Sequence, residues 1–163
     1  MKTSMSLKIA AAFCCVLALT ACSKKNTPDL EATTVGQAAP GSEKDFAVNV
    51  GDRIYFAEDQ SALAPEAQET LRKQAAWLSQ YSGVTIQVEG HADERGTREY
   101  NISLSARRAT AAREFLIAQG IDGTRISSIA YGKERPVAKC DAEQCWSQNR
   151  RAVTVITGGA KTS

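Results

Sequence analysis

The sequence has little of what metal-dependent and nucleophilic enzymes need. It contains one histidine, His91, so a zinc site built from several imidazoles is excluded. It also lacks an HExxH motif, a glycine-rich phosphate loop and a nucleophile elbow, which mark zinc proteases, nucleotide-binding proteins and serine hydrolases. We therefore expect no catalytic centre, metal or cofactor, and interpret His91 as a hydrogen-bonded structural residue rather than a metal ligand or general base.

A long apolar run is also missing. The longest one, Ile9–Leu19, is shorter than the ~20 residues of a membrane-spanning helix and fits the core of a secretory signal. It ends in Leu-Thr-Ala-Cys at Cys22, which resembles a lipobox. That resemblance implies cleavage after residue 21 and lipid on Cys22; the alternative is an ordinary signal peptide with a chance cysteine. Ser23 stands where inner-membrane lipoproteins tend to carry Asp, so we expect lipid anchoring in the outer membrane with the domain facing the periplasm.

Neither sign of charge is in excess once the signal is removed. The chain has 20 Lys+Arg and 18 Asp+Glu. Residues 1–21 contain Lys2 and Lys8 and no acid, so the remainder balances at 18 against 18. A nucleic-acid partner is not expected, because such proteins present a basic face.

Cysteine is scarce outside the signal. Cys14 and Cys15 leave with it and Cys22 is the expected lipid site, so Cys140 and Cys145 remain. In an oxidising compartment a disulfide between them would close a small loop worth roughly 2 kcal/mol. Two free thiols or half of a metal site are the alternatives, and the metal site is weaker because there is no second cysteine pair.

The rest of the chain divides into three parts. Residues 22–46 carry the lipid site and a polar stretch without apolar periodicity, which predicts a flexible tether. Residues 47–158 form one domain, since roughly 110 residues support a single small core. Residues 159–163 are a C-terminal tail.

Apolar periodicity predicts an α+β domain of order β-α-β-α-β-β. Its architecture is a two-layer sandwich with the helices on one face of a mixed sheet. Ser103 or Ser105 is expected to cap the second helix, whose buried face includes Leu104. The expected strands are 48–56, 84–89, 126–131 and 152–156, and the first helix is 65–82.

The most distinctive segment is Gly90–Ala109, GHADERGTREYNISLSARRA, an acidic turn bounded by glycines and followed by an amphipathic helix. It resembles the signature of OmpA-like peptidoglycan-binding domains, and the likeness extends from about Val48 to Ile156. The resemblance implies the same sandwich, a non-enzymatic role and non-covalent binding of peptidoglycan.

Asp93 and Arg108 carry the expected chemistry. A carboxylate can pair with an ammonium, and a guanidinium can hold a carboxylate by two parallel hydrogen bonds. The zwitterionic centre of meso-diaminopimelate offers both groups, and the family resemblance assigns its binding to these two positions. A structural salt bridge between them is the alternative.

Other site residues come from the resemblance alone. Asn101 and Leu104 are expected to line the pocket, and Phe56 and Ala57 to meet the ligand at the end of the first strand. Many relatives have Asp where this chain has Ala57, so the chain lacks that contact or uses Glu58 or Asp59 instead. One arginine of the Asn-Arg-Arg element, Arg150 or Arg151, either lines the site or fixes the last strand.

The partners are likewise implied by resemblance. They are the wall and the Tol system, with the propeller protein TolB competing for the same face and a role in envelope constriction at division. One alternative is a family member that anchors the wall outside the Tol system. Another is a wall hydrolase with Asp93 and Glu94 as an acid/base pair, although adjacent residues in a polar turn suit that geometry poorly.

Overall fold

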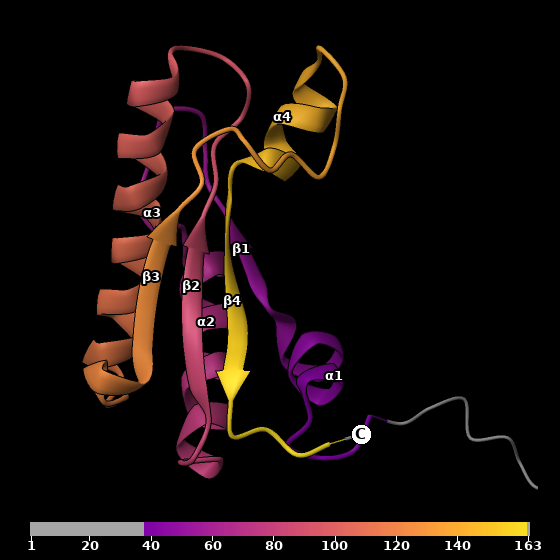
Figure 1. Cartoon of the computed structure of the whole chain (residues 1–163), viewed down its shortest axis with the longest axis vertical. Helices are drawn as coiled ribbons and strands as arrows, with labels where there is room; N and C mark the ends of the chain where they lie inside the picture. Colours follow the sequence, from indigo (N-terminus) through magenta and orange to yellow (C-terminus); the bar gives the residue numbers. More distant parts are fainter. Residues whose placement is uncertain (1–37, 163) are drawn as a thin grey trace, which may run out of the picture. The chain divides into compact units, whose positions relative to one another are not determined.

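The structure, a computed structural model, describes residues 38–162. Two long helices cover one face of a four-stranded sheet of order β1-β4-β2-β3 (Figure 1). β2 and β3 are parallel, and β4 runs antiparallel to β1 and β2. The predicted α+β sandwich is confirmed. The strands are β1 (Arg53–Tyr55), β2 (Thr85–Gly90), β3 (Ile126–Ala130) and β4 (Arg151–Gly158), and the long helices are α2 (Pro65–Gln80) and α3 (Arg98–Ala118).

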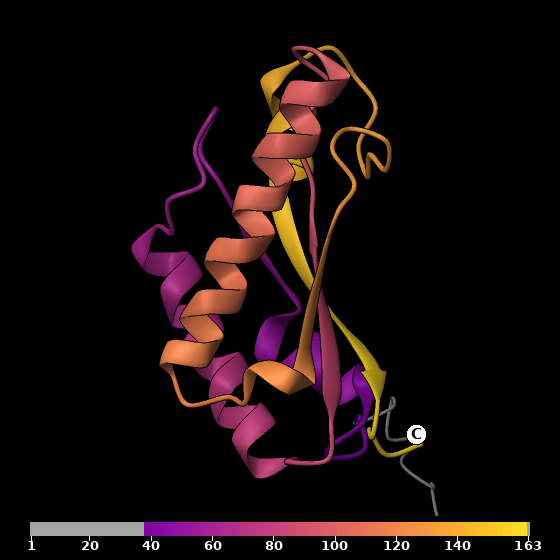
Figure 2. The same cartoon turned by 60° about the vertical axis from the view of Figure 1, so that its left-hand side comes forward.

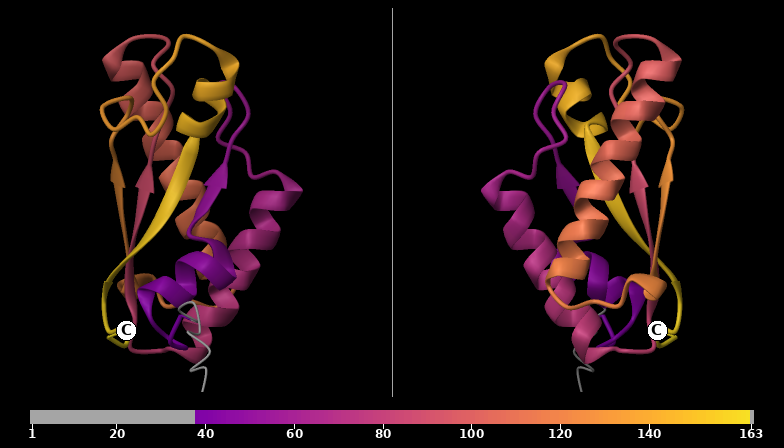
Figure 3. Two further views of the ribbon diagram at one scale, coloured as in Figure 1. Left: turned by 90° about the vertical axis from the view of Figure 1, so that its right-hand side faces the viewer. Right: turned by 90° about the vertical axis from the view of Figure 1, so that its left-hand side faces the viewer.

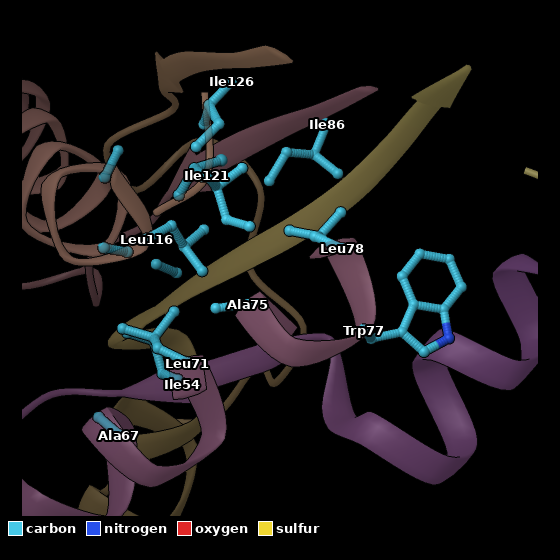
Figure 4. Packing of buried hydrophobic residues seen from close by; sticks show 14 of the residues in the cluster. Ile54, Ala67, Leu71, Ala75, Trp77, Leu78, Ile86, Leu116, Ile121 and Ile126 are labelled. Carbon is cyan, nitrogen blue, oxygen red and sulfur yellow. The ribbon is translucent and has the colours of Figure 1, made fainter. Parts of the chain in front are cut away.

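The core lies between the helices and the sheet. Ile86 and Val88 of β2 are buried, as their alternation with polar residues predicts. They face the apolar stripes of the two helices, including Leu71 and Leu78 of α2 and Leu116 of α3 (Figure 4). Each such side chain contributes roughly 1.5–3 kcal/mol on burial. Among the described residues, none of the helices combines the length and hydrophobicity needed to cross a bilayer.

The helix α3 begins earlier than expected. Its cap is Thr97, whose hydroxyl accepts a hydrogen bond from the backbone N–H of Tyr100. The predicted caps, Ser103 and Ser105, are wrong. Ser105 is buried inside the helix, where its hydroxyl accepts the N–H of Gly132 at 2.9 Å. α3 therefore runs alongside β2 and β3 for most of its length (Figure 2).

The predicted strand 48–56 is also wrong for most of its length. Residues Phe46–Gly51 form a wide helical turn, η1, which follows the short helix α1 (Glu43–Asp45). Phe46 decides this, because its ring packs on Trp77 with the centroids 4.9 Å apart and enters the core, while Val48 stays 70% exposed. A strand continued back to residue 46 would have placed both on the same face.

The folded part is longer at both ends than residues 47–158. Ser42 is buried and pairs with Lys161 in a short parallel bridge. Asp45 accepts a 2.8 Å hydrogen bond from the indole N–H of Trp77. The expected signal, residues 1–21, and Cys22 lie outside the described residues.

Gly90 allows α3 to approach the end of β2. A Cβ at this position would lie 1.9 Å from the backbone oxygen of Ser105, so only glycine fits. The close approach brings the turn after β2 next to the start of α3, at the end of the sheet drawn uppermost in Figures 1 and 3.

Candidate functional site

Four segments distant in sequence meet at this end of the sheet. They are the turn after β2, the start of α3, the loop after β1, and a further short helix, α4 (Glu143–Asn149), which leads into β4 (Figures 1 and 3). Between the first three lies a hollow of about 240 Å³. It is lined by Glu58, Asp59, Asp93, Arg95, Gly96, Tyr100, Asn101 and Leu104.

A larger hollow, about 470 Å³, lies between residues 42–44 and the C-terminal residues 156–162. It contains none of the residues that the sequence singles out. The smaller hollow is the better candidate site, because three carboxylates and a guanidinium converge on it and charged groups of both signs can bind a zwitterion.

Asp93 is buried at the wall of the smaller hollow, with 8% of its surface exposed. Its Oδ1 accepts the backbone N–H of Arg95 at 3.1 Å and its Nε at 3.2 Å. Its Oδ2 accepts Nη2 of Arg95 at 2.6 Å and Nη1 of Arg150 at 3.5 Å. Burial raises the pKa of Asp93, but these hydrogen bonds and the arginine charges outweigh it and lower the pKa below its usual value. The carboxylate is thus held ionised.

Arg108 is fully buried behind the hollow and does not line it. Its Nε donates to the carbonyl of Gln60 at 2.8 Å, Nη1 to that of His91 at 2.9 Å and Nη2 to that of Ala57 at 3.2 Å. Burial lowers the pKa of Arg108 to about 10, which leaves it charged at neutral pH. The guanidinium therefore joins the loop after β1 to the turn after β2.

No ion pair joins Asp93 to Arg108 among residues 38–162; the ion-pair partners of Asp93 there are Arg95 and Arg150. The alternative interpretation, a structural salt bridge between Asp93 and Arg108, is therefore not realised among these residues.

The other predicted residues surround this arrangement. Asn101 and Leu104 line the hollow, and the amide of Asn101 donates to the carbonyl of Arg95 at 2.7 Å. Phe56 is buried, and its ring centroid lies 5.1 Å from the guanidinium carbon of Arg108. Ala57 does not line the hollow, and its carbonyl accepts a hydrogen bond from Arg108. Glu58 and Asp59, the two acids after Ala57, both line the hollow.

Arg95 is a site residue that the sequence did not single out. Besides Asp93, its guanidinium contacts Glu58 through Nη1 at 2.7 Å and stacks over the Trp146 ring, 4.2 Å from the centroid. Its position two residues after Asp93 could have identified it from the sequence, because a turn can bring side chains with this spacing into contact. The contact with Trp146 had no local signal.

The backbone of the turn is held by other side chains. The ammonium of Lys133 donates to the carbonyls of Glu94 at 3.0 Å and Gly96 at 2.7 Å. With Asn101 bonded to the intervening carbonyl of Arg95, three successive carbonyls are satisfied. The turn is therefore organised independently of the Arg95 side chain.

Helix α4 was not predicted and borders the site. Its Glu143 pairs with Arg150, and the indole N–H of its Trp146 donates to Glu94 at 2.9 Å. A disulfide joins Cys140 to Cys145 across the start of this helix. The two arginines that follow α4 are both buried but differ in their partners. Arg150 contacts Asp93, whereas Arg151 donates to the carbonyl of Arg135 at 3.2 Å.

His91 is buried, 2% exposed, and its ring stacks on Tyr131. Neither ring nitrogen has a hydrogen-bond partner within the described part of the chain. The expectation of a hydrogen-bonded ring is therefore wrong, and the residue's hydrogen bonds come from its backbone. In the same part of the chain, no three His, Cys, Asp or Glu residues are grouped to hold a metal ion.

Comparisons with known proteins agree with this fold. Residues 55–150 match the OmpA family. The "Peptidoglycan-associated lipoprotein" of Mesorhizobium japonicum is 56% identical over 147 residues, covering 88% of each chain. That of Brucella abortus is 54% identical over 157 residues, covering 94% of each.

Solved structures are similar as well. The crystal structure of the peptidoglycan-associated lipoprotein from Burkholderia pseudomallei superposes with a TM-score of 0.66 at 33% identity, covering 70% of this chain and 98% of that one. The C-terminal domain of Helicobacter pylori MotB reaches a TM-score of 0.62 at 22% identity, covering 66% and 84%. The second likeness concerns the fold alone.

Proposed function

Because the chain belongs to the OmpA family, we propose that it anchors the outer membrane to the cell wall by binding peptidoglycan without a covalent bond. The relatives that match most of its length are named peptidoglycan-associated lipoproteins. In this proposal Cys22 carries the lipid, and the domain of residues 38–162 binds the wall from the periplasmic side.

The ligand group we propose is the zwitterionic centre of meso-diaminopimelate. One observation carries this: an ionised, nearly buried carboxylate, Asp93, lies at the wall of the hollow, and the Arg108 guanidinium is buried next to the segments that line it. Asp93 receives the ammonium. The Arg108 guanidinium receives the carboxylate of the ligand. Three of its five N–H groups donate to backbone carbonyls, and two remain for the ligand. Ala57 and Gln60, whose carbonyls cover it, belong to the loop after β1, so a small shift of that loop admits the ligand.

Hydrolysis of the wall is the less favoured alternative. A general acid needs a raised pKa, and the pKa of Asp93 is lowered. Glu94 accepts a hydrogen bond from the indole N–H of Trp146. Incubation with purified sacculi should release no soluble fragments; steady release would support the hydrolase.

We further propose that the chain acts in the Tol system during envelope constriction, with TolB binding the same face. This proposal rests on the family resemblance of the sequence. Cross-linking in growing cells tests it: TolB should be captured by the wild type, and an anchor outside the Tol system would not capture it.

The binding test uses the mature chain and purified sacculi. The wild type should sediment with sacculi, and free meso-diaminopimelate should release it. Asp93→Ala should lose roughly thirtyfold to several thousandfold in affinity, because removing one partner of a desolvated charge pair costs about 2–5 kcal/mol. Asp122→Ala is the matched control: Asp122 accepts the N–H of Thr124 at 2.8 Å, outside the site, so its loss should affect stability without affecting binding.

A folded Asp93→Ala protein with wild-type binding would contradict the assignment. Arg108→Ala is less informative, because it leaves three buried carbonyls without their donors and should lower the melting temperature. Arg108→Lys keeps a charge but not the forked geometry, so we expect it to bind poorly. Arg107→Ala, an exposed neighbour, should bind normally.

A further inference from the structure

The carboxylate that the proposed function assigns to the ligand is already occupied by the chain itself. Asp93 accepts four hydrogen bonds, three of them from Arg95 and one from Arg150. A carboxylate offers about four lone-pair sites. An incoming ammonium can therefore bind Asp93 only where an existing donor leaves.

We propose that the Arg95 side chain is an internal competitor, which a ligand ammonium must displace from Asp93 and which thereby lowers the affinity of the site for a free ammonium. This inference rests on the proposed function. Of the four donors, the backbone N–H of Arg95 is fixed in the turn, and Arg150 is 3.5 Å away and paired with Glu143. The Arg95 guanidinium holds Asp93 most closely, at 2.6 Å.

Arg95 also has the freedom to leave. Its side chain is 33% exposed, against 10% for that of Asp93. The turn does not depend on it, because Lys133 and Asn101 hold the three carbonyls of residues 94–96. Rotation of the side chain therefore opens Asp93 without unfolding the loop.

Two further contacts receive the displaced guanidinium. Glu58 lies 2.7 Å from Nη1 and is 66% exposed, at the outer side of the hollow. The Trp146 ring lies 4.2 Å from the guanidinium carbon, and a cation over an aromatic face is stabilised even near solvent. Both contacts are independent of Asp93, so Arg95 keeps a neutralising partner after it swings outward.

The competition acts only on a ligand that carries a charged amine. A ligand whose amine is acylated has no positive charge with which to replace Arg95 on Asp93. Apparent affinity falls in proportion to the fraction of molecules in which Asp93 is free. Removing the competitor should therefore help a ligand with a free ammonium and leave an acylated ligand unaffected.

The test measures the dissociation constant of the mature chain for a soluble stem peptide containing meso-diaminopimelate, and for the same peptide acetylated on the free amine. Arg95→Ala should bind the free-amine peptide about twofold to fivefold more tightly than the wild type, the scale of one partly exposed ion pair. It should bind the acetylated peptide no better than the wild type does. Arg98→Ala, an exposed arginine paired with Glu134 outside the hollow, is the control and should change neither value.

A folded Arg95→Ala protein that binds the free-amine peptide equally or more weakly would overturn the inference, since Arg95 would then be a ligand contact or a bystander. Equal tightening for both peptides would overturn it too. If the alanine variant does not fold, Arg95→Gln, which keeps length without charge, should tighten binding in the same direction. A wild-type protein that binds neither sacculi nor the peptide defeats the proposed function itself, whereas wild-type binding without the Arg95 effect defeats only this inference.

Discussion

Arg108 shows how one buried charge can organise a binding site. A guanidinium removed from water is costly unless its donors are satisfied. Each of the three nitrogens of Arg108 donates to a backbone carbonyl, from Ala57, Gln60 and His91. The side chain thereby holds together two segments that the sheet alone would not connect. Its structural and its proposed binding roles use different N–H groups.

The burial of His91 can be tested through the pH dependence of the free energy of unfolding. Burial, followed by the charges of Arg151 and Arg135, lowers the pKa of His91 from 6.5 to about 4; the carboxylate of Glu89, 3.6 Å away, is too distant for a hydrogen bond. The unfolded chain takes up this proton near pH 6.5 and the folded protein only near pH 4. The stabilisation that comes from keeping His91 neutral in the folded protein is therefore fully present above pH 6.5. As the pH falls from 6.5 to 4, the free energy of unfolding decreases by up to ~3 kcal/mol.

We predict that His91→Phe, which retains a ring to stack on Tyr131, removes most of this pH dependence. Urea unfolding of wild type and variant at pH 7 and pH 4.5 measures it. From pH 7 to pH 4.5, the free energy of unfolding of the wild type should fall by ~2–3 kcal/mol more than that of the variant. Equal losses would mean that His91 is not the group responsible.

Helix α4 adds contacts to this site that the turn after β2 and the start of α3 do not provide by themselves. It places Trp146 against Arg95 and Glu94, and Glu143 against Arg150. The amide of Asn149, at its end, accepts the N–H of Val137 at 2.8 Å and donates to the carbonyl of Ala138 at 2.8 Å. A helix of seven residues is too short to be stable alone, so these contacts and the Cys140–Cys145 bond must maintain it.

We predict that replacing both Cys140 and Cys145 with Ser lowers the free energy of unfolding by about 2 kcal/mol and loosens α4. Because Trp77 is buried, increased quenching of tryptophan fluorescence by acrylamide would report on Trp146. Alkylation of the denatured, non-reduced wild type should find no free thiol on either cysteine. Two modified cysteines, or unchanged quenching in the variant, would contradict this role of the bond.

At the scale of the whole molecule, a wall-binding domain works as an anchor only if the chain is attached to the membrane. The covalent span from Cys22 to the first described residue, 38, is at most ~55 Å. In the proposal that Cys22 carries the lipid, that limit bounds how far from the membrane residue 38 can lie. It is shorter than a tether reaching residue 46 would allow, since residues 42–46 belong to the folded part.

We predict that Cys22→Ser yields an uncleaved precursor that no longer incorporates palmitate, while the purified domain still binds sacculi. Metabolic labelling and membrane fractionation measure the first effect, and the sacculus pull-down measures the second. Cys140→Ser is the matched control and should be labelled normally. Undiminished labelling of the Cys22 variant would end the assignment of the lipid site.

The sequence alone determined those features of this protein that depend on a few neighbouring residues. Alternation in β2, helical periodicity in α2, and the glycine-bounded turn before α3 act over a few residues, so their patterns identify the elements and the order of the sandwich. Asp93, Asn101 and Leu104 lie within one such stretch, and all three line the hollow. The family resemblance of the same stretch is confirmed by the match over residues 55–150.

Only the tertiary structure decided the rest. Phe46 turns an expected strand into a helical turn because Trp77, distant in sequence, receives its ring. α4 has no strong pattern of its own. Arg95 meets Glu58, and Arg108 meets Gln60 and Ala57, across 37 to 51 residues of sequence. Sequence periodicity reports which face of an element is apolar, whereas the pairing of a charged side chain depends on which segments the folded chain brings within hydrogen-bonding distance.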